Sequence, residues 1–286
     1  MSEVFDDTIC ELGEGLLWHP LRQQLFWFDI LQGRLHTREG GRHRAVSFPE
    51  YVSAAGWVSE TELLIASESR LFLFDVDRER SEDVEGLEPD TKNTRANDGR
   101  ADPWGGFWIS TMGKDAAKGA ATIHRFYDGA LTPVVQGITI PNAICFSPDR
   151  AFAYYADTVT GKIMRLALEP QDGWPDGDPE VFLDLTDEGL LPDGAVVDQA
   201  GNLWNAQWGA WRVACYSPDG DFLRAVPFDA AHTSCPAFGG SDLSTLFCTS
   251  ALELLSDVDA ARSDRHGQTF SAPETGQGQA EHRVIL

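Results

Sequence analysis

The chain has 286 residues, and its 22 basic and 45 acidic side chains give a formal net charge of −23 at pH 7. This charge opposes binding to nucleic-acid phosphates and to anionic membrane surfaces, so we expect neither nucleic acid nor membrane as a partner. An acidic protein instead concentrates cations at its clefts, which favours a metal site.

The N-terminal residues show no basic segment followed by an apolar one, so we expect a cytoplasmic protein. The five cysteines are odd in number and include no CxxC pair, which predicts reduced thiols in the core.

Short polar turns followed by alternating apolar runs recur along the whole chain, at intervals of about 40 to 50 residues. The runs are, in chain order, Leu25–Trp27, Leu63–Ile65, Phe107–Ile109, Phe152–Tyr154, Leu203–Asn205 and Leu246–Cys248. A second apolar run usually follows the first, so that each repeat predicts two hairpins and one antiparallel blade. We therefore expect an all-β fold, a six-bladed β-propeller of four-stranded antiparallel blades, as one domain over residues 1–286.

The two ends of the chain must close this ring, because blades in an open arc leave unpaired strand edges. The runs Val4–Cys10 and His282–Leu286 are the natural pair to share a blade, so we expect N- and C-terminal strands to close the ring. Residues Ala251 to Arg262 are expected to contain one short helix.

Oxygen-bearing residues precede four of the six turns at one fixed offset. The turns open at His19, Val58, Asp102, Ser147, Asp198 and Ser241. Five residues before them stand Glu14 in the first repeat, Asn97 in the third, Asn142 in the fourth and Asp193 in the fifth. Equivalent positions in a closed ring are related by rotation, so these side chains should converge near the axis. Ser53 and Pro236 hold the two remaining positions and would leave one side open for water and substrate.

Two carboxylates and one or two amide oxygens, without His or Cys, form a hard-oxygen ligand set. Such a set suits Ca²⁺, Mg²⁺ or Mn²⁺ better than a metal that prefers thiolates. Zn²⁺ and ferrous iron stay open as alternatives.

Six short motifs together resemble one known family across nearly the whole chain. They are Gly13–Gly15, Arg95–Arg100, Ser110–Met112, Pro141-Asn142, Pro192–Gly194 and Thr233–Cys235. In this order and spacing they are similar to the senescence-marker-protein-30/gluconolactonase/regucalcin family. The resemblance implies a six-bladed β-propeller with one divalent metal cation near the axis, and hydrolysis of sugar lactones to aldonic acids.

The resemblance also implies roles for individual residues. Glu14, Asn142 and Asp193 take the metal-ligand places, and Arg95 and Asn97 take substrate-contact places. The four equivalent positions are thereby divided into three ligands and one substrate contact.

Within that scheme, Asp193 is our choice for the general base that activates water, with Glu14 as the alternative. Lys114 departs from the family, some members of which have an acidic substrate-contacting residue near this point. A lysine that faces the pocket would bind an anionic substituent on the sugar, whereas a solvated loop lysine would not.

The expected function is that of a metal-dependent sugar lactonase, a carboxylic-ester hydrolase acting on an aldono-lactone. The substrate is a small-molecule sugar lactone of the glucono-1,5-lactone type, or a 6-substituted anionic one such as 6-deoxy-6-sulfogluconolactone. Organophosphate hydrolysis and a non-catalytic calcium-binding propeller are the alternatives. We expect a monomer or a weak homo-oligomer.

Overall fold

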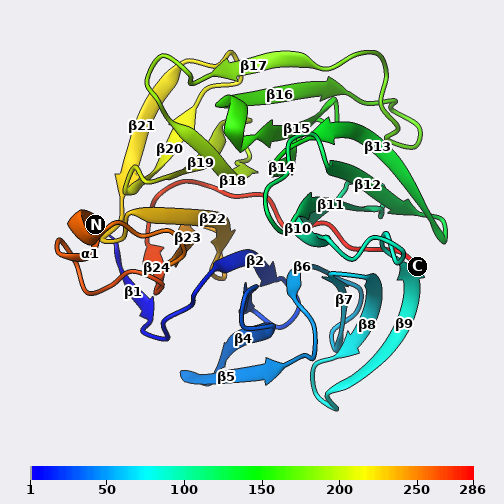
Figure 1. The fold of residues 1–286 in the computed structure, drawn as a ribbon, viewed down its shortest axis with the longest axis horizontal. Helices are drawn as coiled ribbons and strands as arrows, with labels where there is room; N and C mark the ends of the chain where they lie inside the picture. Colours follow the sequence, from blue (N-terminus) through cyan, green and yellow to red (C-terminus); the bar gives the residue numbers. More distant parts are fainter. Residues whose placement is uncertain (1) are drawn as a thin grey trace.

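The computed structural model describes residues 2–286 and shows an all-β, propeller-like arrangement of sheets around a central axis (Figure 1). The first sheet contains β2 (Gly13–His19), β3 (Gln24–Asp29), β4 (Arg34–Glu39) and β5 (Arg42–Ser47). The second contains β6 (Val52–Trp57), β7 (Glu62–Ser67), β8 (Arg70–Asp75) and β9 (Arg80–Gly86). Both are antiparallel, with the strands side by side in chain order.

The next two sheets repeat this pattern. One contains β10 (Thr94–Ala101), β11 (Phe107–Gly113), β12 (Ala121–Tyr127) and β13 (Ala130–Ile138). The other contains β14 (Pro141–Phe146), β15 (Phe152–Asp157), β16 (Lys162–Ala167) and β17 (Glu180–Asp184), with a 3₁₀ turn at Thr158–Thr160. The predicted apolar runs lie in β3, β7, β11 and β15, which confirms the repeat in this part of the chain.

The remaining strands form one eight-stranded sheet. It contains β18 (Leu191–Val197), β19 (Leu203–Trp208), β20 (Arg212–Tyr216), β21 (Phe222–Pro227), β22 (His232–Gly239), β23 (Thr245–Ala251), β24 (Thr269–Ala272) and β1 (Glu3–Asp6). A single residue pair, Trp208 with His232, joins the half that ends at β21 to the half that begins at β22. The last two predicted runs lie in β19 and β23.

The N-terminal strand closes the ring, but its partner differs from the expected one. β1 pairs antiparallel with β24, with Glu3 opposite Ser271 and Val4 opposite Phe270. The predicted pairing with residues 282–286 is therefore wrong. β24 offers the edge that β1 occupies, and residues 282–286 belong to no strand.

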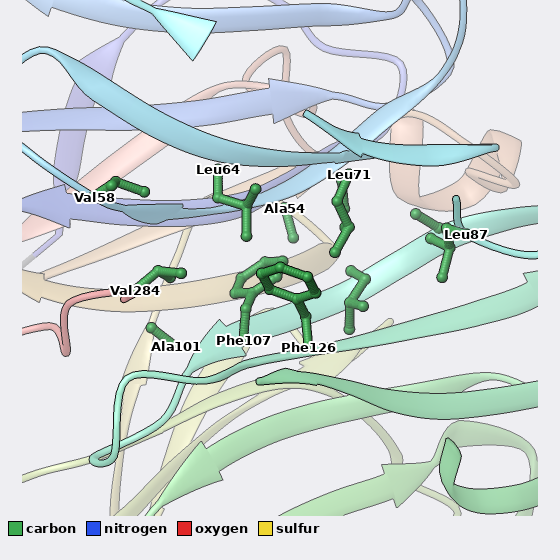
Figure 2. Close-up of a cluster of buried hydrophobic side chains, with 12 residues drawn as sticks. Ala54, Val58, Leu64, Leu71, Leu87, Ala101, Phe107, Phe126 and Val284 are labelled. Carbon is green, nitrogen blue, oxygen red and sulfur yellow. The ribbon is translucent and has the colours of Figure 1, made fainter. Parts of the chain in front are cut away.

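The C-terminal segment instead crosses the ring, drawn in red in Figure 1. Gln279 donates a hydrogen bond to the carbonyl oxygen of Val197 at 2.9 Å, and the Val284 N–H donates to the Trp57 carbonyl oxygen at 2.9 Å. Figure 2 shows Val284 beside Phe107 and Ala101, where its apolar side chain is fully buried. The segment is therefore held by burial and by backbone hydrogen bonds.

The apolar cores lie between neighbouring sheets. In Figure 2, Leu64 and Leu71 from the second sheet face Phe107 and Phe126 from the third. β3 is buried along its full length, whereas β5 alternates with solvent-exposed residues. Neighbouring sheets pack face to face, so an inner strand such as β3 is covered on both of its faces.

The short helix α1 (Asp257–Ala260) lies within the stretch expected to be helical. The Ser256 side chain caps it by accepting a hydrogen bond from the Asp259 N–H, a typical N-cap interaction. Over residues 2–286, no helix has the length and apolarity that crossing a membrane requires.

The first strands of the repeats surround the axis. In cyclic order, β2 contacts β6, β6 contacts β10, β10 contacts β14, β14 contacts β18, β18 contacts β22, and β22 contacts β2. All the residues expected at the axis lie on these strands, so the fold brings together positions that are far apart in the sequence.

Candidate active site

A β-bulge interrupts the first strand of each repeat near the predicted site residues. The register shifts begin at Glu14 in β2, at Ala96 in β10, at Asn142 in β14 and at Pro192 in β18. A bulge inserts an extra residue, bends the strand and redirects its side chains, and it is common beside active sites. The constant offset in the sequence is therefore the position of this bulge ahead of the first turn.

Backbone conformation at two of these bulges explains the local sequence. Gly15 and Ala143 both have φ of 58°, in the left-handed region that disfavours side chains. A Cβ atom on Gly15 would also lie 2.1 Å from the Ser53 carbonyl oxygen, so this position requires glycine. The bulge thus fixes the direction of the neighbouring Glu14.

Hydrogen bonds connect the predicted residues of β10 and β14. Arg95 Nη1 donates to Asn97 Oδ1 at 2.8 Å, and Asn97 Nδ2 donates to Asn142 Oδ1 at 2.9 Å. Asn142 Nδ2 in turn donates to Thr158 Oγ1 at 2.9 Å, and that hydroxyl donates to the Pro192 carbonyl oxygen at 2.7 Å. The structure therefore links Arg95, Asn97 and Asn142 to the strand that carries the fifth-repeat site.

Glu14 and Asp193 are buried close enough to affect each other's ionisation. Burial and then the negative charge of Asp98 raise the pKa of Glu14 to about 8. Burial and then the negative charge of Glu14 raise the pKa of Asp193 well above its usual range. Two buried carboxylates of like charge disfavour each other's ionised form, so they need a nearby cation to ionise together.

Arg95 supplies part of that positive charge. The guanidinium is buried, and burial lowers its pKa, while the negative charges of Glu253 and then Glu14 oppose that shift. Arg95 in turn lowers the pKa of Glu14, yet the net shift of Glu14 remains upward. The site therefore retains an excess of carboxylate over positive charge, which a divalent cation would balance.

The donor atoms present fit such a cation. Glu14 and Asp193 offer carboxylate oxygens, and Asn142 Oδ1 has a second lone pair besides the one that accepts from Asn97. An all-oxygen set with two carboxylates matches the preferences of Ca²⁺, Mg²⁺ and Mn²⁺.

Lys114 lies further from this group. Its ammonium is 2.7 Å from Glu68 Oε1 and also donates to the Lys92 carbonyl oxygen at 3.2 Å. It lies 5.7 Å from the ring centroid of Tyr51. The charge of Lys114 is therefore already paired.

Three acidic or aromatic residues near the site lay outside the sequence prediction. Asp98 accepts a hydrogen bond from the Ile144 N–H at 2.7 Å and acts electrostatically on Glu14. Glu253 follows β23 and acts on Arg95, and no repeat pattern marks its position. Tyr51 stands two residues before Ser53, the same offset as Arg95 before Asn97, so the register contained a signal for it.

Comparisons with known proteins agree with this arrangement. Residues 12–252 match the family model described as SMP-30/Gluconolactonase/LRE-like region. The crystal structure of a calcium-binding protein, regucalcin, from Agrobacterium tumefaciens has a TM-score of 0.97 to this chain at 38% identity, covering 100% of this chain and 98% of that one.

Two relatives of similar length have named activities. A 6-deoxy-6-sulfogluconolactonase of Pseudomonas putida is 33% identical over 94% of each chain. A pentonolactonase of Haloferax volcanii is 32% identical over 97% of this chain and 96% of the relative. The family model and these relatives together span nearly the whole chain, which therefore belongs to the SMP-30/gluconolactonase/LRE-like family.

Proposed function

We propose that this protein is a metal-dependent sugar lactonase, which opens an aldono-lactone of the glucono-1,5-lactone type to its aldonic acid. The observation that carries the proposal is the grouping of Glu14, Asn142 and Asp193 with Arg95 and Asn97 at the bulges of the central strands. The named lactonases among its relatives support the same reaction class.

The proposal includes a six-bladed ring that forms one domain over residues 1–286. The eight-stranded sheet consists of two four-stranded halves joined only at Trp208 and His232 within the described residues 2–286. Counting each half as a blade gives six, in agreement with the cyclic contacts of the first strands.

In the proposed mechanism, Glu14, Asn142 and Asp193 would hold one divalent cation, which supplies polarisation of the lactone carbonyl and stabilises the oxyanion of the tetrahedral intermediate. Asp193 takes a proton from the attacking water as the water oxygen bonds to the carbonyl carbon. The ring C–O bond then breaks, and the leaving oxygen takes up that proton. General base catalysis of this kind contributes about 10²- to 10⁴-fold.

Arg95 and Asn97 position the sugar in this scheme. The planar guanidinium of Arg95 has more donors than its contacts with Ala96 and Asn97 use, so it can bind a sugar hydroxyl or the new carboxylate. Asn97 Oδ1 accepts from Arg95 and keeps one lone pair for a hydroxyl. The pair therefore orients the substrate while holding Asn142 in place.

The pairing of Lys114 with Glu68 favours an uncharged lactone as the substrate. An ammonium 2.7 Å from a carboxylate would have to exchange that partner to bind a sulfonate or phosphate on the sugar. The anionic 6-substituted lactones are thus the less favoured substrates of the same site.

The test is a pH-indicator assay over a panel of aldono-lactones, with chelator and after addition of Ca²⁺, Mg²⁺, Mn²⁺ or Zn²⁺. We expect chelation to abolish hydrolysis and one of these ions to restore it. Undiminished hydrolysis by metal-free protein would overturn the proposal. Hydrolysis of organophosphates alone, or metal binding without any hydrolysis, would identify one of the two alternative functions.

A further inference from the structure

A second group of metal-ligating side chains lies away from the central site. One ligand atom each from Cys10, Asp29 and His36 lies within 4.8 Å of the other two, and all three residues are buried. Asp29 and Trp27 project from the same face of β3, and His36 is opposite Trp27 on β4. Cys10 comes from the segment between β1 and β2 and packs in the same apolar cluster as Trp27.

This place is the seam at which the ring closes. The Cys10 N–H donates to the Gly267 carbonyl oxygen at 2.9 Å, just before β24. The cluster around Cys10 also contains Phe247 of β23, beside the first sheet. The group therefore lies where the first sheet meets the strands that close the ring.

His36 has a ring nitrogen without a partner. Its Nδ1 is 2.9 Å from His43 Nε2, whereas its Nε2 is buried and has no hydrogen-bond partner in the described part of the chain, residues 2–286. When Nδ1 donates to His43, Nε2 carries a free lone pair. A metal-binding histidine commonly donates its second ring N–H in this way, which fixes the tautomer of the ligand.

The other two side chains are also arranged as ligands. Asp29 accepts from the Glu11 N–H at 2.9 Å and from the Leu12 N–H at 3.2 Å, one bond on each oxygen, so its carboxylate is oriented and retains lone pairs. The indole N–H of Trp27 acts to lower the pKa of Cys10 and has no acceptor of its own among residues 2–286. A thiolate at Cys10 would be that acceptor.

A nucleophilic role for this Cys, His and Asp group does not fit. Burial raises the pKa of Cys10 to about 12, so the metal-free thiol stays protonated, and the residue has no exposed surface. Burial lowers the pKa of His36 to about 4, which keeps the imidazole neutral. A neutral imidazole and a buried thiol are what a metal ion converts into ligands on binding, by displacing the thiol proton.

We propose that Cys10, Asp29 and His36 form a second metal site, which binds Zn²⁺ and joins the closing segment to the first sheet. A thiolate, an imidazole and a carboxylate form a mixed set typical of zinc, unlike the all-oxygen set at the axis. One thiolate and one carboxylate neutralise Zn²⁺, so that the buried group carries no net charge. Ligand atoms around tetrahedral zinc lie about 3.3 to 3.7 Å apart, so ligand atoms within 4.8 Å of one another have to approach by about 1.5 Å at most.

The test uses Co²⁺, which substitutes for zinc and gives an absorption band when a thiolate binds it. Metal-free wild-type protein should bind two equivalents of Co²⁺, one with a thiolate band. Glu14→Gln should bind one equivalent and keep the band in full, because only the central site is altered. Cys10→Ala and His36→Asn should each lose one equivalent, and Cys10→Ala should lose the band.

The matched control is Cys215→Ala, another buried cysteine, which should leave both the band and the stoichiometry unchanged. Zn²⁺ should raise the melting temperature of Glu14→Gln and leave that of the double variant Glu14→Gln/His36→Asn, in which both sites are altered, nearly unchanged. Absence of a thiolate band in Glu14→Gln, which keeps all three ligands, would overturn the proposal even if Cys10→Ala failed to fold. Retention of the band in folded Cys10→Ala would also count against the proposal. A band of reduced intensity in Cys215→Ala would count against it as well.

Discussion

Removing the charge of Glu14 should change how the stability of the metal-free protein depends on pH. The pKa of this carboxyl is about 8 in the fold, against an ordinary value of 4.5. Between these two pH values the folded chain retains a proton that the unfolded chain has released. The stabilisation is therefore complete below about pH 4.5 and is lost as the pH rises through 8.

The size of this effect on stability follows from the shift in the pKa of Glu14. A change from 4.5 to about 8 corresponds to roughly 5 kcal/mol of unfolding free energy, at 1.36 kcal/mol per pH unit. For a chain of this size, a change of about 5 kcal/mol moves the melting temperature by roughly 10 °C or more. Asp193 adds a loss of the same sign, and burial, the first cause of its raised pKa, remains in Glu14→Gln, so this substitution should reduce the pH dependence and not abolish it.

The assay is thermal unfolding followed by circular dichroism, on chelator-treated protein, at pH 5 and pH 8. Wild type should melt at a markedly lower temperature at pH 8 than at pH 5, Glu14→Gln should show a smaller difference, and the exposed control Glu82→Gln should behave as wild type. Added Ca²⁺ should raise the melting temperature of wild type more at pH 8 than at pH 5, because metal and proton compete for the carboxylates. The same pH dependence in Glu14→Gln and wild type would refute the electrostatic argument.

Four further substitutions test the proposed roles. Asp193→Ala and Asn142→Ala should each lower kcat/KM by at least about 10²-fold in the lactone assay while circular dichroism shows an intact fold, because each removes one ligand oxygen. Asn205→Ala should also lower kcat, but by a smaller factor. Asn205 Nδ2 donates hydrogen bonds to the carbonyl oxygens of Asp193 and Gly194, at 2.9 and 3.1 Å, and so supports the bulge. An unchanged kcat would show that the bulge keeps its shape without these bonds. Lys114→Ala should leave kcat/KM for glucono-1,5-lactone within about twofold, whereas a selective loss of roughly ten- to hundredfold on 6-sulfo or 6-phospho lactones would assign it to an anionic substituent.

The strand pattern could be predicted because it depends on local sequence. Each apolar run, such as Leu25–Trp27 in β3, is short, lies between turn residues and is buried, as an inner strand is. The closure could not be predicted in the same way. Both Thr269–Ala272 and His282–Leu286 are short segments that could add to a sheet edge, and the choice depends on which edge is left free and on the buried space that receives Val284.

For the site too, part of the arrangement could be predicted from the sequence and part could not. The constant offset of Glu14, Asn142 and Asp193 is visible in the sequence because their three repeats place the bulge at nearly the same point of the first strand. The conformation of the bulge has a weaker signature, since Ala143 adopts the left-handed conformation without being glycine. Glu253 lies beyond the last repeat and acts on Arg95 from a loop, where no periodicity could mark it.

The four residues at the common offset are Glu14, Asn97, Asn142 and Asp193, and they differ in chemical role. The hydrogen bonds of Asn97 show this difference. Asn97 donates through one nitrogen to both Asn142 Oδ1 and the Pro141 carbonyl oxygen, and its own oxygen accepts from Arg95. Its amide is therefore turned with the nitrogen toward Asn142, which leaves Asn142 Oδ1, Glu14 and Asp193 as the oxygen donors of the group. The orientation of this single amide supports the proposed division into three ligands and one substrate contact, which the family resemblance implies.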